Sequence, residues 1–290
     1  MSFELLALAL LGGLLRIGPP LICAAVGDCL TQRAGRFNLG LEGVVPCTAV
    51  LAALGGQHGA GIGVLAAVAG GAALAGLHAL CCSLPRSNEI AVGIAFLVGG
   101  TALARFVGDG QLAVAHPSLP QIDLVVEAAG RSHVLGLSWL LLAALAAAVL
   151  IHWGLRATGA GLLLRAAGQP GGAAALAASG RSQTLLQLAA TSAGGAFAGL
   201  AGAHLALFHP GGWSDGLGAG VGIGAVTIVF IARARPLVAV LLAAGFAAIV
   251  AFGLALQVAL GTGGYHLFSV LPFILALLVM GTARRRPGRA

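Results

Sequence analysis

The sequence contains no lysine, little charge of either sign and few aromatic residues. Its 290 residues are 8% charged and 5% aromatic, and all fifteen basic residues are arginine. Because the phosphate-binding GxxxxGK[ST] loop requires lysine, the sequence excludes a site of that type. Soluble domains carry about 25% charged and about 45–50% apolar residues. With 59% hydrophobic residues, this chain has more apolar surface than one soluble core buries, so we expect a membrane protein.

Sites for metals and nucleic acids are also missing from the sequence. The five cysteines form no CxxC pair, and no histidine follows them at zinc-ligand spacing, so we expect reduced packing residues and no metal or other cofactor. The arginines are scattered between apolar runs and do not form a soluble basic domain, which argues against a nucleic-acid partner. An HExxH motif is absent, and an intramembrane enzyme is therefore disfavoured.

Nine apolar runs cover most of the chain, each near the roughly 20 residues needed to cross about 30 Å of hydrocarbon. They fall near 4–26, 38–55, 60–83, 88–107, 134–154, 184–208, 216–232, 236–257 and 266–283. We therefore expect an all-α fold, a polytopic transmembrane helix bundle of about nine (8–10) spans in one domain over residues 1–290. Glycine and proline in the first run, and glycine in 216–232, are also typical of a broken or re-entrant helix.

The arginines predict the orientation of this bundle. With nine crossings, an external N-terminus and a cytoplasmic C-terminus, twelve of the fifteen arginines lie on the cytoplasmic side, as the positive-inside rule requires. Five of the eight acids then lie outside. Two connections are long. The outer one, 108–133, fits a solvated connector or a short interfacial helix, and the inner one, 155–183, predicts a short helix outside the bilayer.

A charged segment precedes the second apolar run. Arg33–Gly43 reads RAGRFNLGLEG and places two arginines, Asn38 and Glu42 beside lipid. An unpaired charge at this depth costs up to a few kcal/mol, so we expect Glu42 to pair with Arg33 or Arg36, or to face a water-filled path.

Four further segments follow Arg33–Gly43, and together the five resemble the motifs of a known family. They are Asn88–Gly93, Gly161–Gly168, Gly194–Ala203 and Gly220–Pro236. In this order they resemble the inner-membrane permease subunits of ABC importers for nucleosides and simple sugars. Their motifs are R-x-G-x-x-N-L-G-L-E-G, N-E-[VI]-x-x-G, G-L-R-L-R-A-V-G and S-G-A-L-A-G-L-A-G-A, with a final R-x-R-P.

The resemblance implies a transport subunit of a bacterial inner membrane and not an enzyme. The chain would form the solute path with a second, homologous permease chain, in contact with membrane lipid. Two cytoplasmic ATP-binding subunits would drive it, and an extracytoplasmic solute-binding protein would deliver the solute. The 155–183 connection would be the coupling loop that docks on the ATP-binding subunits. Its contact residues would be Arg165, Gly168, Gln169, Pro170 and Gly180.

Some positions depart from the family pattern. The coupling loop has Gln169 and Pro170 where the family commonly has Glu-Asn-Pro, and Gly180 comes about two residues late. Two polar positions are apolar here, Leu97 and Val221. A different solute or polar contacts from the partner permease would each account for these losses.

The residues that we expect near the solute path are few. Asn38, Glu42, Asn88 and Glu89 are the polar candidates, and Trp213 fits either an interfacial anchor or a platform that stacks on a sugar or base. His204 and His209 are typical of interfacial anchors. The spacings Gly195-xxx-Gly199 and Gly220-xxx-Gly224 predict close helix contacts.

Two other transporters remain as alternatives. A branched-chain amino-acid ABC permease belongs to the same superfamily, and the GLEG motif argues against it. A stand-alone secondary transporter would need paired charges or a protonatable carboxylate in the middle of a span, and no apolar run has either at its centre.

Overall fold

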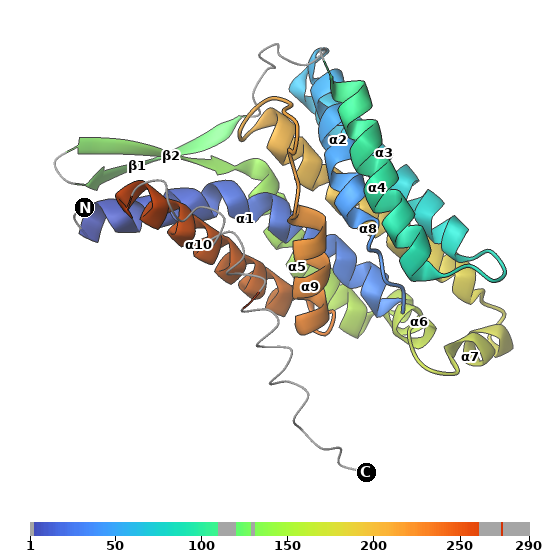
Figure 1. The fold of residues 1–290 in the computed structure, drawn as a ribbon. Helices are drawn as coiled ribbons and strands as arrows, with labels where there is room; N and C mark the ends of the chain where they lie inside the picture. Colours follow the sequence, from blue (N-terminus) through green and yellow to red (C-terminus); the bar gives the residue numbers. More distant parts are fainter. Residues whose placement is uncertain (1–2, 110–119, 129–130, 261–273, 275–290) are drawn as a thin grey trace.

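The computed structural model describes residues 3–109, 120–128, 131–260 and 274. Ten helices and one antiparallel strand pair account for most of them (Figure 1). The helices are α1 (Phe3–Arg33), α2 (Leu41–Gly56), α3 (Ala60–Cys82), α4 (Glu89–Gly108), α5 (Trp139–Ala157), α6 (Gly159–Ala167), α7 (Gly172–Ala178), α8 (Gln183–Leu207), α9 (Val221–Ile231) and α10 (Pro236–Leu260). The strands are β1 (Gln121–Ala128) and β2 (Arg131–Ser138).

The polytopic helical bundle is confirmed in its main features. Six of the described helices are long and apolar enough to cross a membrane: α1, α3, α4, α5, α8 and α10. α2 and α9 are apolar but shorter, with 16 and 11 residues. At 1.5 Å per residue, the 11 residues of α9 reach about 16 Å, roughly half of the hydrocarbon thickness. The expected span at 266–283 lies outside the described residues, so the number of nine spans stays a prediction.

α8 packs against α1, α2 and α3 in the centre of the bundle. Glycine brings the backbones together there: a Cβ atom at Gly195 would collide with the carbonyl group of Gly71, and one at Gly199 with that of Ala67. The predicted contact at Gly195-xxx-Gly199 is therefore confirmed. In the second pair the prediction holds only at Gly224, which is buried and where a Cβ atom would come within 3.3 Å of the Leu21 side chain of α1. It is wrong at Gly220, which precedes α9 in a left-handed conformation (φ +84) with nothing within 4 Å of a Cβ atom.

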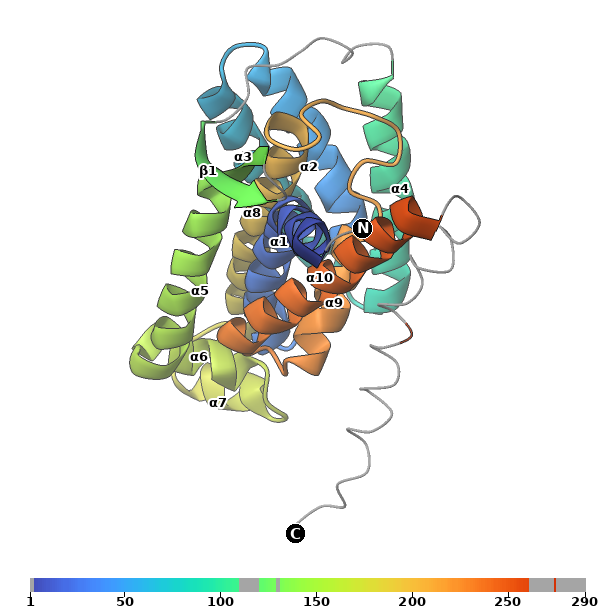
Figure 2. The same cartoon turned by 90° about the vertical axis from the view of Figure 1, so that its left-hand side faces the viewer.

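α1 lies between two groups of helices and joins them. It packs on α8 on one side and on α10, α9 and α5 on the other. α10 packs against α1, and Figure 2, which looks nearly along α1, shows α10 passing next to it. The core between them is built from alanine, valine and leucine, as expected for a chain with few aromatic residues.

The described part of the outer connection, from residue 120 onward, forms a pair of antiparallel strands. β1 and β2 pair in antiparallel register from Gln121 opposite Ser138 to Ala128 opposite Arg131. The strict all-α expectation is therefore wrong at this point, and the fifth apolar helix begins at Trp139 instead of near residue 134. β-Branched residues in this segment favour the extended conformation, and Ser138 ends the strand because its hydroxyl accepts the amide of Leu140 and caps α5 (3.1 Å).

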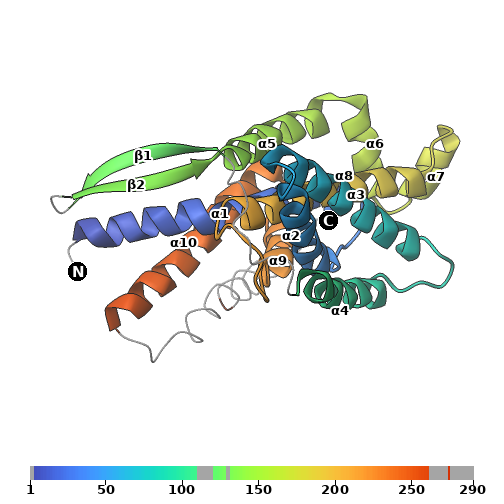
Figure 3. The same cartoon turned by 90° about the horizontal axis from the view of Figure 1, so that it is seen from above.

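The hairpin and the α6–α7 pair lie at opposite ends of α5. β2 leads directly into α5, and α6 follows α5 after Thr158. Figure 3 shows the two features on opposite sides of the molecule. The chain thus has two distinct ends, one with the hairpin and one with the short helices.

Candidate functional site

The segment Arg33–Gly43 connects α1 to α2 at the end of the molecule that carries α6 and α7. α1 ends at Arg33, the chain turns at Gly35 with φ +82, and α2 starts at Leu41. A Cβ atom makes this left-handed conformation costly, so glycine is the residue that suits the turn. The segment is buried on several sides, and its polar side chains contact four other helices.

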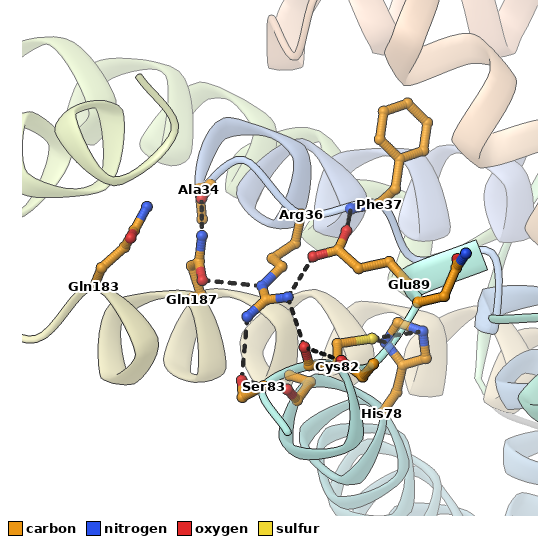
Figure 4. Close-up of polar contacts among 12 residues, drawn as sticks. Ala34, Arg36, Phe37, His78, Cys82, Ser83, Glu89, Gln183 and Gln187 are labelled. Atoms are coloured by element: carbon orange, nitrogen blue, oxygen red, sulfur yellow. Dashed lines mark hydrogen bonds and ion pairs between the residues drawn. The ribbon is translucent and has the colours of Figure 1, made fainter. Parts of the chain in front are cut away.

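Arg36 makes the most contacts of these side chains (Figure 4). It forms an ion pair with Glu89 at the start of α4, and its Nε donates to Oε1 of Gln187 in α8 (2.9 Å). Its other guanidinium nitrogens donate to the carbonyl oxygen of Cys82 (3.2 Å) and the hydroxyl of Ser83 (3.1 Å) at the end of α3. One arginine therefore holds together the ends of α3, α4 and α8.

Glu42 does not pair with an arginine among the described residues, so the first of the two alternatives for this carboxylate is wrong. Its carboxylate accepts the backbone amides of Gly220 (2.5 Å) and Ile223 (2.9 Å), and the side chain is 6% exposed. These amides are among the unpaired donors at the N-terminus of α9, where a negative charge is favoured. Glu42 is therefore a cap for α9 supplied by α2, which is a role that only the tertiary structure reveals.

Asn38 is buried without a hydrogen-bond partner among the described residues. It is 1% exposed, and neither its Nδ2 nor its Oδ1 has a partner there. A buried amide that stays unpaired costs about 1–3 kcal/mol. Asn38 is thus the predicted path residue whose side-chain polar atoms have no partner within the described fold.

Asn88 and Glu89 have structural partners. Asn88 is the N-cap of α4, and its Oδ1 accepts the amides of Ile90 (2.9 Å) and Ala91 (3.3 Å). Glu89 pairs with Arg36 and also accepts the amide of Phe37 (3.4 Å). The N-E motif therefore starts α4 and attaches this helix to the Arg33–Gly43 segment.

The expected coupling loop is folded as α6 and α7 and contacts the same segment. Gly35 and Gly168 meet backbone to backbone, because a Cβ atom at Gly35 would come within 2.8 Å of the Gly168 Cα. Gln183 at the start of α8 donates to the carbonyl oxygen of Ala167 (2.6 Å). A movement of α6 would therefore press directly on the turn between α1 and α2.

The residues predicted to contact the ATP-binding subunits lie on and beside α6 and α7. Gly168, Gln169 and Pro170 form an exposed turn between the two helices, and Gly180 is exposed with φ +70 after α7. Arg165 is half-buried and faces a cavity behind α6. Two short helices replace the single one that we expected, because Pro170 and Gly171 interrupt the helix.

Trp213 lies in the connection between α8 and α9 near the far end of α4. A Cβ atom at Gly108 would collide with the Trp213 indole, so ring and helix end are in close contact. Arg105 and Asp215 form an ion pair across the same junction (2.6 Å), with both side chains about two-thirds exposed. Trp213 thus packs against the end of α4 at the end of the bundle opposite to α6.

Comparisons with known proteins identify the family of this chain. The sequence model of a family described as branched-chain amino acid transport system / permease component matches residues 10–280. The chain belongs to this permease family. It is also 32% identical over 252 residues to the Haloferax volcanii protein named "Putative glucose ABC transporter permease protein TsgC13", covering 81% of this chain and 73% of that protein. No solved structure matches.

As an ABC permease, the chain is a membrane-embedded transport subunit and not itself an enzyme. A transporter of this type works with ATP-binding and solute-binding partners. The arrangement of the permease is consistent with such partners, because its short helices and signature segment occupy one end of the helix bundle.

One buried carboxylate of the permease was missed from the sequence. Asp28 is 1% exposed within α1, accepts a hydrogen bond from Gln32 (2.6 Å) and leaves its Oδ1 without a partner in the described chain. Gln32 also donates to the carbonyl oxygen of Val226 in α9 (3.1 Å). The i, i+4 spacing of Asp28 and Gln32 was a usable signal, but the expected first span ended near residue 26, before both residues.

The histidines of the permease differ from the expected interfacial anchors. His204 is fully buried, and its Nδ1 contacts the hydroxyl of Ser138 (3.2 Å). His209 lines a cavity of about 510 Å³ between α1, the hairpin and α10, together with Arg16 and His133. Burial lowers the pKa of His209, and repulsion by Arg16 lowers it further. None of the predicted path residues lines this cavity.

The sequence was also expected to lack a GxSxG motif, and this is wrong, because residues 212–216, Gly-Trp-Ser-Asp-Gly, match this pattern of serine hydrolases. In that class the serine follows a strand and begins a helix. Here the pattern lies in the connection between α8 and α9, and the Ser214 hydroxyl has no histidine partner within the described residues. The match does not represent a nucleophile site.

Proposed function

We propose that this chain is the permease subunit of an ABC importer for a simple sugar or a nucleoside, located in a bacterial inner membrane. The observation that carries the proposal is the backbone contact between Gly35 and Gly168. It joins the expected coupling loop to the segment whose residues hold α4 and α9. The N-terminus and the hairpin would lie outside, and α6 and α7 in the cytoplasm.

The contacts support a mechanical sequence. ATP-binding subunits that draw together would move the turn at Gln169 and Pro170. Gly168 would push on Gly35, and the motion would reach α4 through Arg36 and Glu89 and α9 through Glu42. Because α9 is too short to span the membrane, its displacement would open or close a path beside it.

The polar candidates divide into two roles in this proposal. Glu42, Asn88 and Glu89 would position α9 and α4 at the path. Asn38 would contact the solute or the water around it, because its amide has no partner in the described chain. Trp213 would stack on the apolar face of a sugar or base at the outer mouth.

The solute class rests on two arguments. The GLEG motif resembles permeases for nucleosides and simple sugars, and the Haloferax volcanii relative is named as a glucose permease. The proposed partners are a second, homologous permease chain, two cytoplasmic ATP-binding subunits and an extracytoplasmic solute-binding protein. The coupling contacts would be Arg165, Gly168, Gln169, Pro170 and Gly180.

Reconstitution of the complete transporter tests this proposal. The permease would be placed in proteoliposomes with its ATP-binding subunits, the second permease and the solute-binding protein. Uptake of glucose, uridine and leucine would be compared with and without ATP. We expect ATP-dependent uptake of glucose or uridine, and none when the ATP-binding subunits are omitted.

Two results would contradict the proposal. Uptake of leucine alone would support the branched-chain amino-acid alternative. Solute transport by the isolated chain without ATP would support a secondary transporter, in which Asp28 would be the candidate for the coupled proton.

A further inference from the structure

Four arginines converge where α1 and α5 end and α10 begins. Arg33, Arg156, Arg165 and Arg235 line one cavity of about 210 Å³ together with His152. We call this cavity the arginine pocket. Arg33 ends α1, Arg156 lies in α5, Arg165 in α6 and Arg235 in the turn before α10, so the tertiary structure and not a sequence run brings them together.

The arginine pocket has no acidic side chain in its lining. None of its four arginines forms an ion pair within the described chain, where the two ion pairs are Arg36–Glu89 and Arg105–Asp215. The positive charges of the other three arginines repel that of Arg33. The buried Nε of Arg33 has no hydrogen-bond partner in the described part of the protein. Like charges this close repel one another unless an anion lies between them.

The backbone at the pocket also favours an anion. α10 begins at Pro236 in the pocket lining and has no acidic residue in its first turn. The unpaired amides at a helix N-terminus carry a partial positive charge. Arg33 donates to the carbonyl oxygen of Ala234 (3.0 Å), which fixes the turn before α10 and keeps Arg235 at the pocket.

Apolar side chains surround the pocket on the two helices that flank it. On α5, Val149 and Trp153 are 57% and 64% exposed and lie about one turn from His152 and Arg156. On α10, Leu237 and Leu241 follow Pro236 on one face and are 38% and 73% exposed. A ligand that fits both surfaces has an anionic head and hydrocarbon chains.

We propose that the arginine pocket binds the phosphate group of an anionic phospholipid, whose acyl chains lie along α5 and α10. Guanidinium groups suit this ligand because they bind phosphate oxygens in a bidentate manner. An acidic surface of an ATP-binding subunit is disfavoured, because α1, α5, α6 and the start of α10 line the pocket and exposed apolar residues lie next to it along α5 and α10.

Lipid retention by the full-length chain tests this site. The protein would be purified from vesicles of equal parts phosphatidylglycerol and phosphatidylcholine, and the lipids that remain bound after detergent washing would be measured by mass spectrometry. The pocket variant is Arg156→Gln/Arg235→Gln, because both side chains are exposed and their loss leaves the core intact. Arg181→Gln is the matched control, an exposed arginine next to α7 that is not part of the pocket lining.

We expect the unmodified chain and the control to retain phosphatidylglycerol in preference to phosphatidylcholine. In the pocket variant, the ratio of bound phosphatidylglycerol to bound phosphatidylcholine should fall by at least about fivefold, which is the effect of one basic residue near a membrane surface. Arg156→Lys/Arg235→Lys should keep most of it, because lysine also attracts phosphate. This charge-preserving variant separates a lost site from a misfolded protein.

Three results would overturn the inference. One is an unchanged lipid preference in the pocket variant. Another is thermal stabilisation of the chain by inorganic phosphate or glycerophosphoglycerol that equals the stabilisation by phosphatidylglycerol, which would indicate a site for a free anion. The third is a pocket variant that keeps its lipid preference but no longer copurifies with the ATP-binding subunit, which would assign the pocket to that partner. The inference concerns the bundle end and not the solute, so it stands or fails independently of the uptake experiment.

Discussion

At the residue scale, the polar side chains of this permease mostly hold helices in place. Arg36 and Glu89 bind each other across two elements, Glu42 caps the neighbouring helix α9, and Asn88 caps its own helix α4. In a chain with 8% charged residues, each of the contacts between elements joins segments that otherwise meet only through small apolar side chains. Their loss should therefore affect stability before it affects solute specificity.

The ion pair of Arg36 and Glu89 leads to the first prediction. Glu89→Gln removes the charge partner of an arginine that is only 13% exposed, so we expect a loss of about 1–3 kcal/mol of stability. The exposed pair of Arg105 and Asp215 supplies the control: Asp215→Asn should cost only about 0.2–1 kcal/mol. Thermal unfolding of both variants in the same detergent gives the comparison. Equal losses would mean that the Arg36 contacts add no stability beyond that of a surface ion pair.

At the element scale, the short helices α9 and α6 depend on their neighbours. α9 receives its N-terminal cap from Glu42 of α2 and a side-chain contact at Val226 from Gln32 of α1. α6 touches the α1–α2 turn through Gly168. Both helices therefore move with α1 and α2, and two predictions concern these contacts.

Removal of the α9 cap should loosen the start of this helix. Glu42→Ala leaves the amides of Gly220 and Ile223 without their acceptor, so their hydrogen exchange should become faster. Thr227→Val in the same helix removes only a hydroxyl bond to Ile223 within α9 and should leave exchange at residues 220–223 unchanged. Hydrogen-exchange mass spectrometry measures both variants. Similar exchange in the Glu42 variant and the unmodified chain would show that the carboxylate does not hold α9.

A methyl group at Gly168 should disturb the coupling contact. Gly168→Ala places its Cβ against the carbonyl oxygen of Arg33, whereas Gly159→Ala in α6 meets only open space. We expect the first variant to lose about 1–3 kcal/mol from overpacking and most of its ATP-driven uptake. The second should match the unmodified chain, or be slightly more stable because alanine favours helix over glycine. Thermal unfolding and proteoliposome uptake test the pair, and unchanged uptake in Gly168→Ala would argue against transmission through this contact.

At the scale of the whole molecule, the chain separates a hairpin end from an end rich in arginine. Arg33, Arg156, Arg165 and Arg235 gather at the end that carries α6, as the positive-inside rule predicts for a cytoplasmic face. The orientation itself follows from the charges and stays a prediction.

Cysteine labelling of intact cells tests this orientation. Ser132→Cys on the hairpin and Ser179→Cys after α7 introduce exposed thiols at opposite ends, while the native cysteines are buried or, at Cys81, half-buried. A membrane-impermeant maleimide should label Ser132→Cys from outside and Ser179→Cys only after permeabilisation. The unmodified chain is the control for background labelling. The reverse pattern would invert the proposed topology.

Much of the architecture followed from composition and pattern. Eight of the nine expected apolar runs correspond to described helices, since a hydrophobic run of this length has few alternatives to a helix in lipid. The hairpin was not predicted, although its pairing is local, from Ala128 opposite Arg131 to Gln121 opposite Ser138. Its second strand ends in apolar residues that fall within the expected span at 134–154. The lengths of α2 and α9 also depended on glycine turns whose conformations the sequence does not specify.

The sequence by itself determined that this protein is a membrane-embedded helical permease, because composition sets the solvent and five ordered motifs indicate the family. Only the tertiary structure decided what the motif residues contact. Arg36 forms an ion pair with Glu89, Glu42 accepts the amides at the start of α9, and four arginines from separate segments line one pocket. The physical reason is that a charge in a low-dielectric surrounding binds the partner that folding brings nearest, and that proximity depends on helix packing and not on distance along the chain.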